Sequence, residues 1–299
     1  MADSLAVPSP DRDNRARARA AGTAGATIAD LAGVVLAAGA GTRLMPLTLL
    51  RPKPLCPVGD RPLLDHALAA VGPVVAELAV NVHHGRDQVE GHLTRWAERR
   101  ERLVHISIER DRALGTAGAI GWLHRWLDGR PVLVANADTW HRADLGALVQ
   151  DWDGERVRIL TPTEGPFGPA SVVVASLLPA SMAEALAPAK GEDIQPVGLW
   201  EAVWRAEAEA GRLDTVHTDA VAIDCGTAAD YLRANLTWSV LEGDGSHGGC
   251  RVVGGSVIGE GAVVEGAIER CVVWPGSRVD EGERLHDAIR AGHLTVLVR

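Results

Sequence analysis

Cysteine is scarce in this chain of 299 residues, and its four cysteines lie far apart, at Cys56, Cys225, Cys250 and Cys271. No two of them form a Cys-x-x-Cys pair, which excludes the zinc and redox motifs built on that spacing. Isolated thiols give no disulfide framework either, so we expect reduced cysteines and a cytoplasmic protein.

Long apolar runs and an excess of positive charge are also missing. No stretch approaches the ~20 apolar residues of a membrane span, and the formal net charge is −9. That sign opposes binding to a nucleic acid, so we expect neither a membrane nor a nucleic-acid partner. A polyanionic ligand would have to be bound by a few locally placed cations.

The first thirty residues contain neither the apolar core of a signal peptide nor an apolar period. Arginine is interspersed with aspartate through residues 11–19, and this composition is typical of a solvated, disordered tail. We expect residues 1–30 to form such a tail, with an arginine-rich targeting sequence as the alternative.

Strand and helix patterns alternate from Ala32 to Thr161. Pro62 is expected to open a helix whose apolar side chains share one face. The other expected elements are strands Val34–Leu36, Leu78–Val82, Val104–Glu109, Val132–Ala135, Val157–Leu160 and Ser171–Val174, and helices Asp87–Trp96, Thr116–Trp126, Ala143–Gln150, Val203–Ala210 and Tyr231–Leu241. Repeated strand–helix–strand units predict an α/β, Rossmann-like, mostly parallel sheet with helices on both faces. Ligands of such sheets bind beyond the carboxyl ends of the strands.

The most informative segment is residues 36–54. A glycine loop follows the first strand, and Arg43 and Lys53 supply positive charge, the lysine between two prolines. Glycines let backbone N–H groups close around an anion, and the two cations suit a polyphosphate. A dinucleotide-binding loop is the competing interpretation, but it needs a third small residue where Leu44 stands and an immediate helix. Four prolines exclude a helix across the next dozen positions, and the Walker pattern also fails.

Three further motifs carry candidate ligands. Residues 114–118 (Leu-Gly-Thr-Ala-Gly) and 136–138 (Asn-Ala-Asp) follow expected strands, so both should lie at the same sheet edge as the glycine loop. Residues 224–227 (Asp-Cys-Gly-Thr) add a second aspartate much later in the chain. Two carboxylates are a suitable partial ligand set for Mg²⁺, which prefers oxygen.

Residues 36–54 resemble the signature of the sugar-1-phosphate nucleotidylyltransferases, which make nucleoside-diphosphate sugars, and the resemblance extends over roughly residues 32–240. Residues 81–84 and 138–141 are most similar to the branch that includes mannose-1-phosphate guanylyltransferases and N-acetylmuramate-1-phosphate uridylyltransferases. The resemblance implies the nucleotide-diphospho-sugar transferase fold. It also implies a Mg²⁺-dependent attack of a sugar 1-phosphate on the α-phosphorus of a nucleoside triphosphate, with release of pyrophosphate.

The resemblance also implies residue roles. Arg43 would hold the β- and γ-phosphates, and Lys53 would lie against the α-phosphate or the sugar phosphate. Asp138 and Asp224 would bind Mg²⁺. The nucleotide would contact residues of two loops, namely Leu36, Ala37, Ala38, Gly39, Gly41, Thr42, Arg43, Gly115 and Thr116.

Four details depend on the backbone. Gly115 should admit the base to the main chain, and Thr116 should cap the following helix. Ala137 replaces the family's glycine and would cost about 1 kcal/mol if its position required a positive φ. Taken alone, Asp224 could equally be a helix N-terminal cap.

The sugar-binding region is expected to be short. The family's Glu-Lys-Pro triplet is missing, and residues 161–169 run almost directly into the next strand. The acceptor therefore stays open, and a catalytically inactive regulatory homologue is the alternative function. Retention of both cations and both aspartates favours an active enzyme.

Glycines at 243–249 separate the expected catalytic segment, residues 31–242, from a last segment, residues 250–299. Apolar residues there recur near every sixth position, which resembles the hexapeptide repeat of left-handed parallel β-helices. A hairpin array is the alternative. A short coil would leave an open end, so we also expect a homo-oligomer.

Overall fold

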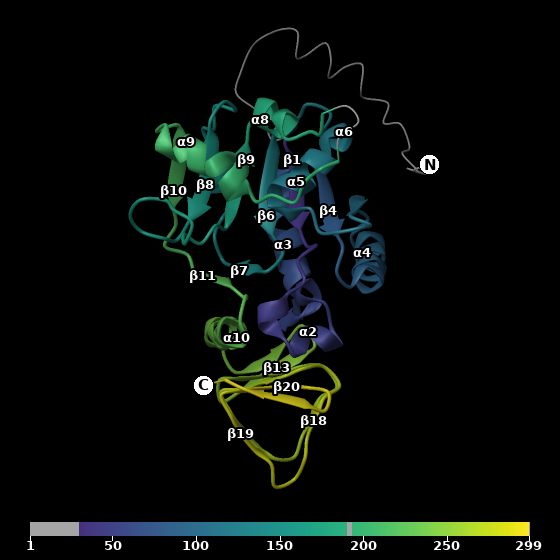
Figure 1. The fold of residues 1–299 in the computed structure, drawn as a ribbon. Helices are drawn as coiled ribbons and strands as arrows, with labels where there is room; N and C mark the ends of the chain where they lie inside the picture. The colour runs from purple at the N-terminus through teal and green to yellow at the C-terminus, as the bar shows by residue number, and fades with distance from the viewer. Residues whose placement is uncertain (1–29, 190–192, 299) are drawn as a thin grey trace.

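The computed structural model of the protein describes residues 30–189 and 193–298, so all but the last residue of the expected N-terminal tail lies outside the described residues. Its central strands are β1 (Ala32–Leu36), β4 (Glu77–Val82), β5 (Val104–Ile108), β6 (Val132–Asn136), β8 (Val157–Thr161), β9 (Ala175–Leu178) and β10 (Leu213–His217). They form one sheet in the order β10-β8-β9-β6-β1-β4-β5 (Figure 1). All neighbours are parallel except β9, which runs antiparallel to β6 and β8. The predicted α/β fold with a mostly parallel sheet is confirmed.

The helices range from 4 to 15 residues in length. They are α2 (Leu47–Leu50), α3 (Leu63–Val71), α4 (Arg86–Arg100), α5 (Gly115–Trp122), α6 (His124–Leu127), α7 (Gly146–Val149), α8 (Ala180–Ala185), α9 (Arg205–Glu209) and α10 (Ala228–Glu242). Shorter turns are the 3₁₀ turns η2 (Thr42–Leu44), η3 (Lys53–Leu55) and η4 (Gly72–Val74) and the π-helical turn η5 (Trp200–Trp204). No helix in the described part of the chain has both the length and the apolarity of a membrane span.

Helices cover both faces of the sheet because successive strand side chains point to opposite sides. In β1, Val35 belongs to a core that includes side chains of α3, α4 and α7. Ala32 and Val34 belong to a second core with side chains of α5, α6 and α8. The expected two-sided arrangement is therefore present.

Two local expectations need correction. The prolines after the glycine loop do not exclude helical turns altogether, since η2, α2 and η3 form there. Pro46 stands at the N-cap of α2 and Pro54 inside the first turn of η3, positions where a missing N–H costs little. The strand expected at Ser171–Val174 forms instead at Ala175–Leu178, because ladder pairing with β6 and β8 begins at Ala175.

The C-terminal strands, which we call the coil, pair in parallel at the centre of the segment and antiparallel at its two ends. They are β12 (Gly245–His247), β13 (Cys250–Val253), β14 (Ser256–Ile258), β15 (Val263–Val264), β16 (Ala267–Glu269), β17 (Val272–Val273), β18 (Arg278–Val279), β19 (Arg284–His286), β20 (Ala288–Ala291) and β21 (Leu294–Leu297). Parallel pairs β14–β17–β20, β15–β18 and β16–β19 make three separate faces. This pairing agrees with a coil of parallel strands, and the short left-handed β-helix remains a prediction. The outer edge of β20 is not open, because β21 pairs with it antiparallel.

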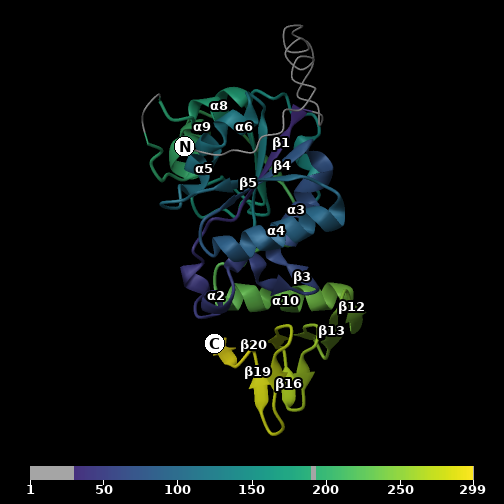
Figure 2. The same cartoon turned by 90° about the vertical axis from the view of Figure 1, so that its right-hand side faces the viewer.

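Helix α10 connects the coil to the sheet domain and lies between them in Figure 2. Tyr231 of α10 donates its hydroxyl to the carbonyl of Pro57, in the two-strand hairpin of β2 (Pro57–Val58) and β3 (Arg61–Pro62). The Trp274 indole N–H in turn donates to the Tyr231 hydroxyl at 3.0 Å. The guanidinium of Arg51 lies 5.1 Å from the centre of the Trp274 ring. The coil thus contacts the loop that carries Lys53.

Candidate active site

The glycine loop after β1 packs closely against the lysine segment. Gly41 has φ +62°, and a Cβ there would lie 2.9 Å from both the Lys53 Cβ and the Thr48 Cγ2. Both the conformation and the close approach require glycine. A Cβ at Gly39 would meet no atom within 4 Å, so the loop is open on that side.

Strand register brings the two predicted metal ligands together. Strand β6 runs parallel to β1 with Leu36 opposite Asn136, so Asp138 follows beside the glycine loop. The short strand β11 (Ala222–Asp224) pairs antiparallel with β7 (Thr139–His141), and this pairing sets Asp224 opposite Thr139. The Cys225 N–H also donates to the Asp138 carbonyl at 2.9 Å.

Lys53 lies between these two carboxylates. Its Nζ is 2.5 Å from Oδ2 of Asp138 and 3.6 Å from Oδ1 of Asp224. The lysine is 6% exposed, so its charge needs such partners. Arg43 is different, because its side chain is 70% exposed and its guanidinium reaches only to 3.8 Å from Asp224. Lys53 is therefore fixed, whereas Arg43 can move toward a ligand.

The two carboxylates interact electrostatically. Burial raises the pKa of Asp224, and the neighbouring charge of Asp138 raises it further, while Lys53 and Arg43 act in the opposite direction. The helix cap after β11 is Thr227, whose hydroxyl accepts the Asp230 N–H at 3.1 Å. Asp224 is therefore not the cap of α10, and its carboxylate faces the site.

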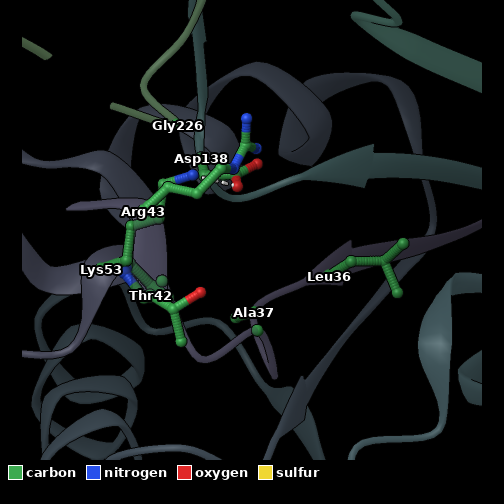
Figure 3. Close-up of a pocket in the computed structure, with 10 residues that line it drawn as sticks. Leu36, Ala37, Thr42, Arg43, Lys53, Asp138 and Gly226 are labelled. Atoms are coloured by element: carbon green, nitrogen blue, oxygen red, sulfur yellow. Dashed lines mark hydrogen bonds and ion pairs between the residues drawn. The ribbon is translucent and has the colours of Figure 1, made fainter. Parts of the chain in front are cut away.

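The glycine loop, Arg43, Lys53 and Asp138 line a cavity of about 160 Å³, and Asp224 is not part of its lining (Figure 3). Its lining consists of Leu36, Ala37, Gly39, Gly41, Thr42, Arg43, Lys53, Pro54, Asp138 and Gly226. Eight of them were predicted from the sequence as site residues. Pro54 and Gly226 were not. A Cβ at Gly226 would lie only 2.9 Å from the Arg43 guanidinium. Its place beside Asp224 in the 224–227 motif could have indicated it.

Three predicted nucleotide contacts lie elsewhere. Ala38 does not line the cavity, and its carbonyl oxygen lies 3.0 Å from Nδ1 of His84. Gly115 has φ +74°, but the space above it is filled by the carbonyl of Val197, whose oxygen would lie 2.5 Å from a Cβ at that position. The expected cap at Thr116 is wrong, because its hydroxyl accepts the N–H of Leu199 at 2.7 Å and does not cap α5.

Ala137 is unstrained. It does not have a positive φ, and it is 1% exposed within the core under α3 and α4. Its N–H donates to the Leu36 carbonyl at 2.9 Å, as an extension of the β1–β6 pairing. Alanine therefore replaces glycine at this position without backbone cost.

A buried polar network, which no sequence motif indicated, connects the glycine loop to the loop after β5. The Ala37 N–H donates to Oδ1 of Asn81, and the Asn81 amide donates to Oε1 of Glu109, both at 2.7 Å. The second Glu109 oxygen accepts the Leu114 N–H at 2.7 Å. Glu109 is 3% exposed, and burial raises its pKa although these hydrogen bonds and nearby His83 lower it. The network fixes the spacing of the two loops.

The donor set fits a hard divalent cation. Two carboxylates face one point, and the Lys53 ammonium already lies between them as a positive charge. Within residues 30–189 and 193–298, no group of three or more His, Cys, Asp and Glu side chains could hold a metal ion. A bound Mg²⁺ would therefore take its other ligands from phosphate and water, as Mg²⁺ commonly does.

A second cavity of about 400 Å³ adjoins the first and shares Leu36 and Asp138 with it. Its lining comes mainly from β6, β9 and residues 171–174 before it, the start of α5, and η5 with residues 198–199 before it, and β1, β7 and β11 add one residue each. The residues are Leu36, Thr116, Val134, Asn136, Asp138, Thr139, Ser171, Val172, Val173, Val174, Ser176, Gly198, Leu199, Trp200, Glu201, Trp204 and Asp224. Two cavities that meet at Asp138 give room for two reactants.

Comparisons with known proteins agree with the motif. Residues 32–164 match the family model described as Nucleotidyl transferase. Over 132 residues the chain is 42% identical to N-acetylmuramate alpha-1-phosphate uridylyltransferase of Caulobacter vibrioides, a match that covers 42% of this chain and 54% of that protein. Over 110 residues it is 36% identical to mannose-1-phosphate guanyltransferase of Aspergillus oryzae, which covers 35% of this chain and 29% of that protein.

The matched region thus spans about half the length of the first relative and less than a third of the second. A solved structure of a glucose-1-phosphate thymidylyltransferase from Bacillus anthracis superposes with a TM-score of 0.56 over 69% of this chain and 94% of that one. At 18% identity this likeness shows the fold alone. The resemblance to sugar-1-phosphate nucleotidylyltransferases is confirmed by the family model and the two relatives.

Proposed function

From the match of residues 32–164 to the nucleotidyl transferase family, we propose that this chain is a Mg²⁺-dependent sugar-1-phosphate nucleotidylyltransferase. The reaction joins a nucleoside triphosphate and a sugar 1-phosphate to give a nucleoside-diphosphate sugar and pyrophosphate. The observation that carries the proposal is the convergence of two cations and two carboxylates, Arg43, Lys53, Asp138 and Asp224, where the two cavities meet.

The chemistry needs positioning more than proton transfer. An oxygen of the sugar 1-phosphate forms a bond to the α-phosphorus, and the bond from that phosphorus to the bridging oxygen of the β-phosphate breaks. Pyrophosphate leaves with the electron pair. Because a phosphate monoester is already ionised near neutral pH, no general base is required. The protein has to bring two anions together and neutralise their charge.

The different exposure of the two cations supports a different task for each. Buried Lys53 is held at the junction of the cavities, where it would contact the α-phosphate or the attacking phosphate. Exposed Arg43 would close onto the β- and γ-phosphates, where its planar fork suits two oxygens at once. The open side of Gly39 leaves the backbone accessible to a phosphate.

Asp138 and Asp224 would hold Mg²⁺ through their carboxylate oxygens. When bound, the ion neutralises charge on the transferring phosphoryl group. Lys53 would then exchange part of its carboxylate pairing for phosphate oxygens. The substrate sugar would occupy the larger cavity, on the other side of Asp138 from the glycine loop.

A substrate screen tests the proposal. The full chain with Mg²⁺ is incubated with each common ribonucleoside triphosphate or dTTP and a panel of sugar 1-phosphates, and pyrophosphate release is measured. We expect release with at least one pair, dependent on the sugar. The alternative, an inactive regulatory homologue, would bind a nucleotide or nucleotide sugar in calorimetry without releasing pyrophosphate from any pair.

Segment boundaries, compartment and assembly form part of the same proposal. We keep the division into a tail (1–30), a catalytic segment (31–242) and a C-terminal coil (250–299), although coil and catalytic segment share one apolar core. The four cysteines are free and buried, which supports a reducing, cytoplasmic compartment.

A homo-oligomer would have to form elsewhere than at β20, for example at the outer edge of β21. Light scattering of the full chain and of a chain ending at residue 292 tests this.

A further inference from the structure

The larger cavity has a charge pattern of its own. Its charged lining residues are three carboxylates, Asp138, Asp224 and Glu201, and no lysine, arginine or histidine is among the described residues that line it. Lys53 pairs with the two aspartates from the side of the smaller cavity. Glu201 has no ion pair within the described part of the chain. Glu201 is exposed, so water screens its charge in part, and its carboxylate acts most strongly on a group that lies directly against it.

The position of Glu201 depends on a glycine. A Cβ at Gly198 would lie 2.3 Å from Oε2 of Glu201 and 3.9 Å from Oγ1 of Thr116. The missing side chain at residue 198 thus makes room for the carboxylate against the backbone, beside Thr116. Both neighbours also line the cavity, so the carboxylate lies at its wall.

Two buried donors of the same cavity lack protein partners. The Ser176 hydroxyl and the Trp204 indole N–H are both buried and make no hydrogen bond to any described residue. Ser176 is 1% exposed, on the central strand β9. A buried donor without a partner costs free energy, so rotation of either side chain toward the cavity would let it donate to an acceptor oxygen of a ligand, such as a sugar hydroxyl or ring oxygen.

Aromatic side chains complete the wall. Trp200 and Trp204 line the cavity from the π-helical turn η5, a kind of turn frequent at functional sites. Phe167 packs against both, with ring centres 5.8 and 5.9 Å away. Aromatic faces suit the apolar side of a ring and attract a positive charge, but they do not attract a carboxylate.

We infer that the sugar bound in this cavity carries no acidic substituent, and that Glu201 is the residue that excludes acidic sugars. This inference rests on the proposed function. The acceptor is a sugar 1-phosphate whose ring is uncharged or bears an amine. An added carboxylate would lie near Glu201 in a cavity whose described lining includes no lysine, arginine or histidine, and like charges at short range repel.

Calorimetric titration tests this without requiring turnover. Four probes are titrated into the full chain with Mg²⁺: glucose 1-phosphate, glucosamine 1-phosphate, glucuronic acid 1-phosphate and N-acetylmuramate 1-phosphate. We expect the first two to bind at least tenfold more tightly than the two acids, which corresponds to about 1.4 kcal/mol. Glu201→Gln should reduce this gap to threefold or less by improving the acids, with little change for glucose 1-phosphate.

Glu209→Gln is the matched control, because Glu209 is an exposed glutamate of the next helix and does not line the cavity. It should leave the discrimination unchanged. The inference is overturned if either acid binds as tightly as glucose 1-phosphate, if none of the four probes binds, or if Glu201→Gln changes all four affinities equally. If the probes are discriminated as expected but no pair releases pyrophosphate, the proposed activity fails while the charge selectivity holds.

Discussion

Lys53 lies between the carboxylates of Asp138 and Asp224, so each of these three side chains sets the environment of the other two. Removing one aspartate takes away half of the proposed metal ligands and one partner of a buried ammonium. Removing the lysine leaves two carboxylates that repel each other, with Arg43 as the remaining cation nearby. Substitutions here should therefore affect metal requirement and turnover differently.

Asp138→Asn and Asp224→Asn should each lower turnover at least a hundredfold, or by about 3 kcal/mol in activation free energy. Each should also raise the Mg²⁺ concentration that gives half-maximal rate, since an amide is a weaker ligand than a carboxylate. The double variant should lose little more, because the first change already disables the shared ion. Pyrophosphate release across a Mg²⁺ titration measures both quantities. Asp219→Asn, in an exposed side chain outside the site, is the control.

Lys53→Ala should impair turnover without raising the half-saturating Mg²⁺ concentration, because the ammonium occupies the point that the metal would share. Pyrophosphate release across the same Mg²⁺ titration measures turnover and the half-saturating Mg²⁺ concentration. Normal turnover and an unchanged Mg²⁺ requirement in both aspartate variants would contradict the site assignment.

The buried Glu109 gives a pH dependence whose sign can be stated. Its folded pKa is raised above the usual 4.5, so the folded state binds its proton more tightly than the unfolded chain does. The stability that the wild type has relative to Glu109→Gln should be greatest below pH 4.5 and decline as the pH rises through the folded pKa. Urea unfolding of both proteins from pH 4 to pH 8 measures the difference. A difference that grows with pH would show that hydrogen bonding outweighs burial.

At the scale of elements, the first residue of α5 must be a glycine for a reason other than ligand access. Gly115 combines a positive φ with a backbone neighbour, the Val197 carbonyl. The N–H groups of Ala117 and Gly118 also point to that carbonyl, at 3.0 and 3.4 Å. The start of α5 is therefore held against residues 197–199, the segment that leads into η5 and the larger cavity.

Gly115→Ala should destabilise the protein by at least about 2 kcal/mol, from left-handed backbone strain and from displacement of Val197. The midpoint of thermal unfolding should fall by roughly 4 °C or more. The same substitution at Gly91 is the control, since that glycine lies inside α4 with only the Arg95 side chain 3.5 Å away. Gly91→Ala should stabilise by up to about 1 kcal/mol. Equal effects at both positions would contradict this assignment.

Elements with a strong local pattern could be predicted from the sequence, and those set by long-range packing could not. The helix opened by Pro62 forms as expected because its five apolar side chains share one buried face. The triplet Val172–Val174 has strand propensity too, but its residues line a cavity, and ladder pairing starts at Ala175. Propensity alone does not show where a strand partner begins.

The residues of the candidate site divide in the same way, into those marked by a local sequence pattern and those brought in by long-range packing. Arg43, Lys53 and Asp138 belong to local motifs, so their spacing identified them. Ser176 and Glu201 reach the larger cavity from a central strand and a π-helical turn distant in sequence, and no local pattern marks either residue. Their function follows from topology, which a single sequence does not display.

At the scale of the whole molecule, Tyr231 joins three parts of the chain. Its hydroxyl donates to Pro57 in the hairpin and accepts from Trp274 in the coil, while Arg51 lies over the Trp274 ring. All of these contacts lie close in sequence or space to the segment that carries Lys53. The C-terminal coil therefore supports the segment that carries Lys53, through its contacts with α10.

A double-mutant cycle with Trp274→Phe and Tyr231→Phe should reveal this support. Trp274→Phe removes the donor of the indole–hydroxyl hydrogen bond, and Tyr231→Phe removes its acceptor. Both changes keep an aromatic ring in the core. We expect each to cost about 1–3 kcal/mol and the pair to show a coupling of about 0.5–1.5 kcal/mol. Urea unfolding supplies these values. Strictly additive effects would mean that the two side chains stabilise the protein independently.

The pairing of β11 with β7 has a consequence for how the protein is made. Asp224 reaches its place beside Asp138 only after the chain has been synthesised far beyond the segment that the family model matches. At roughly 5–20 residues per second, several seconds of translation separate the two aspartates. During that interval the nascent chain has the glycine loop and Lys53 but only one of the two carboxylates. A chain ending near residue 164 contains β1, β4, β5 and β6 but neither β11 nor Asp224, so it should be unable to assemble the proposed metal site.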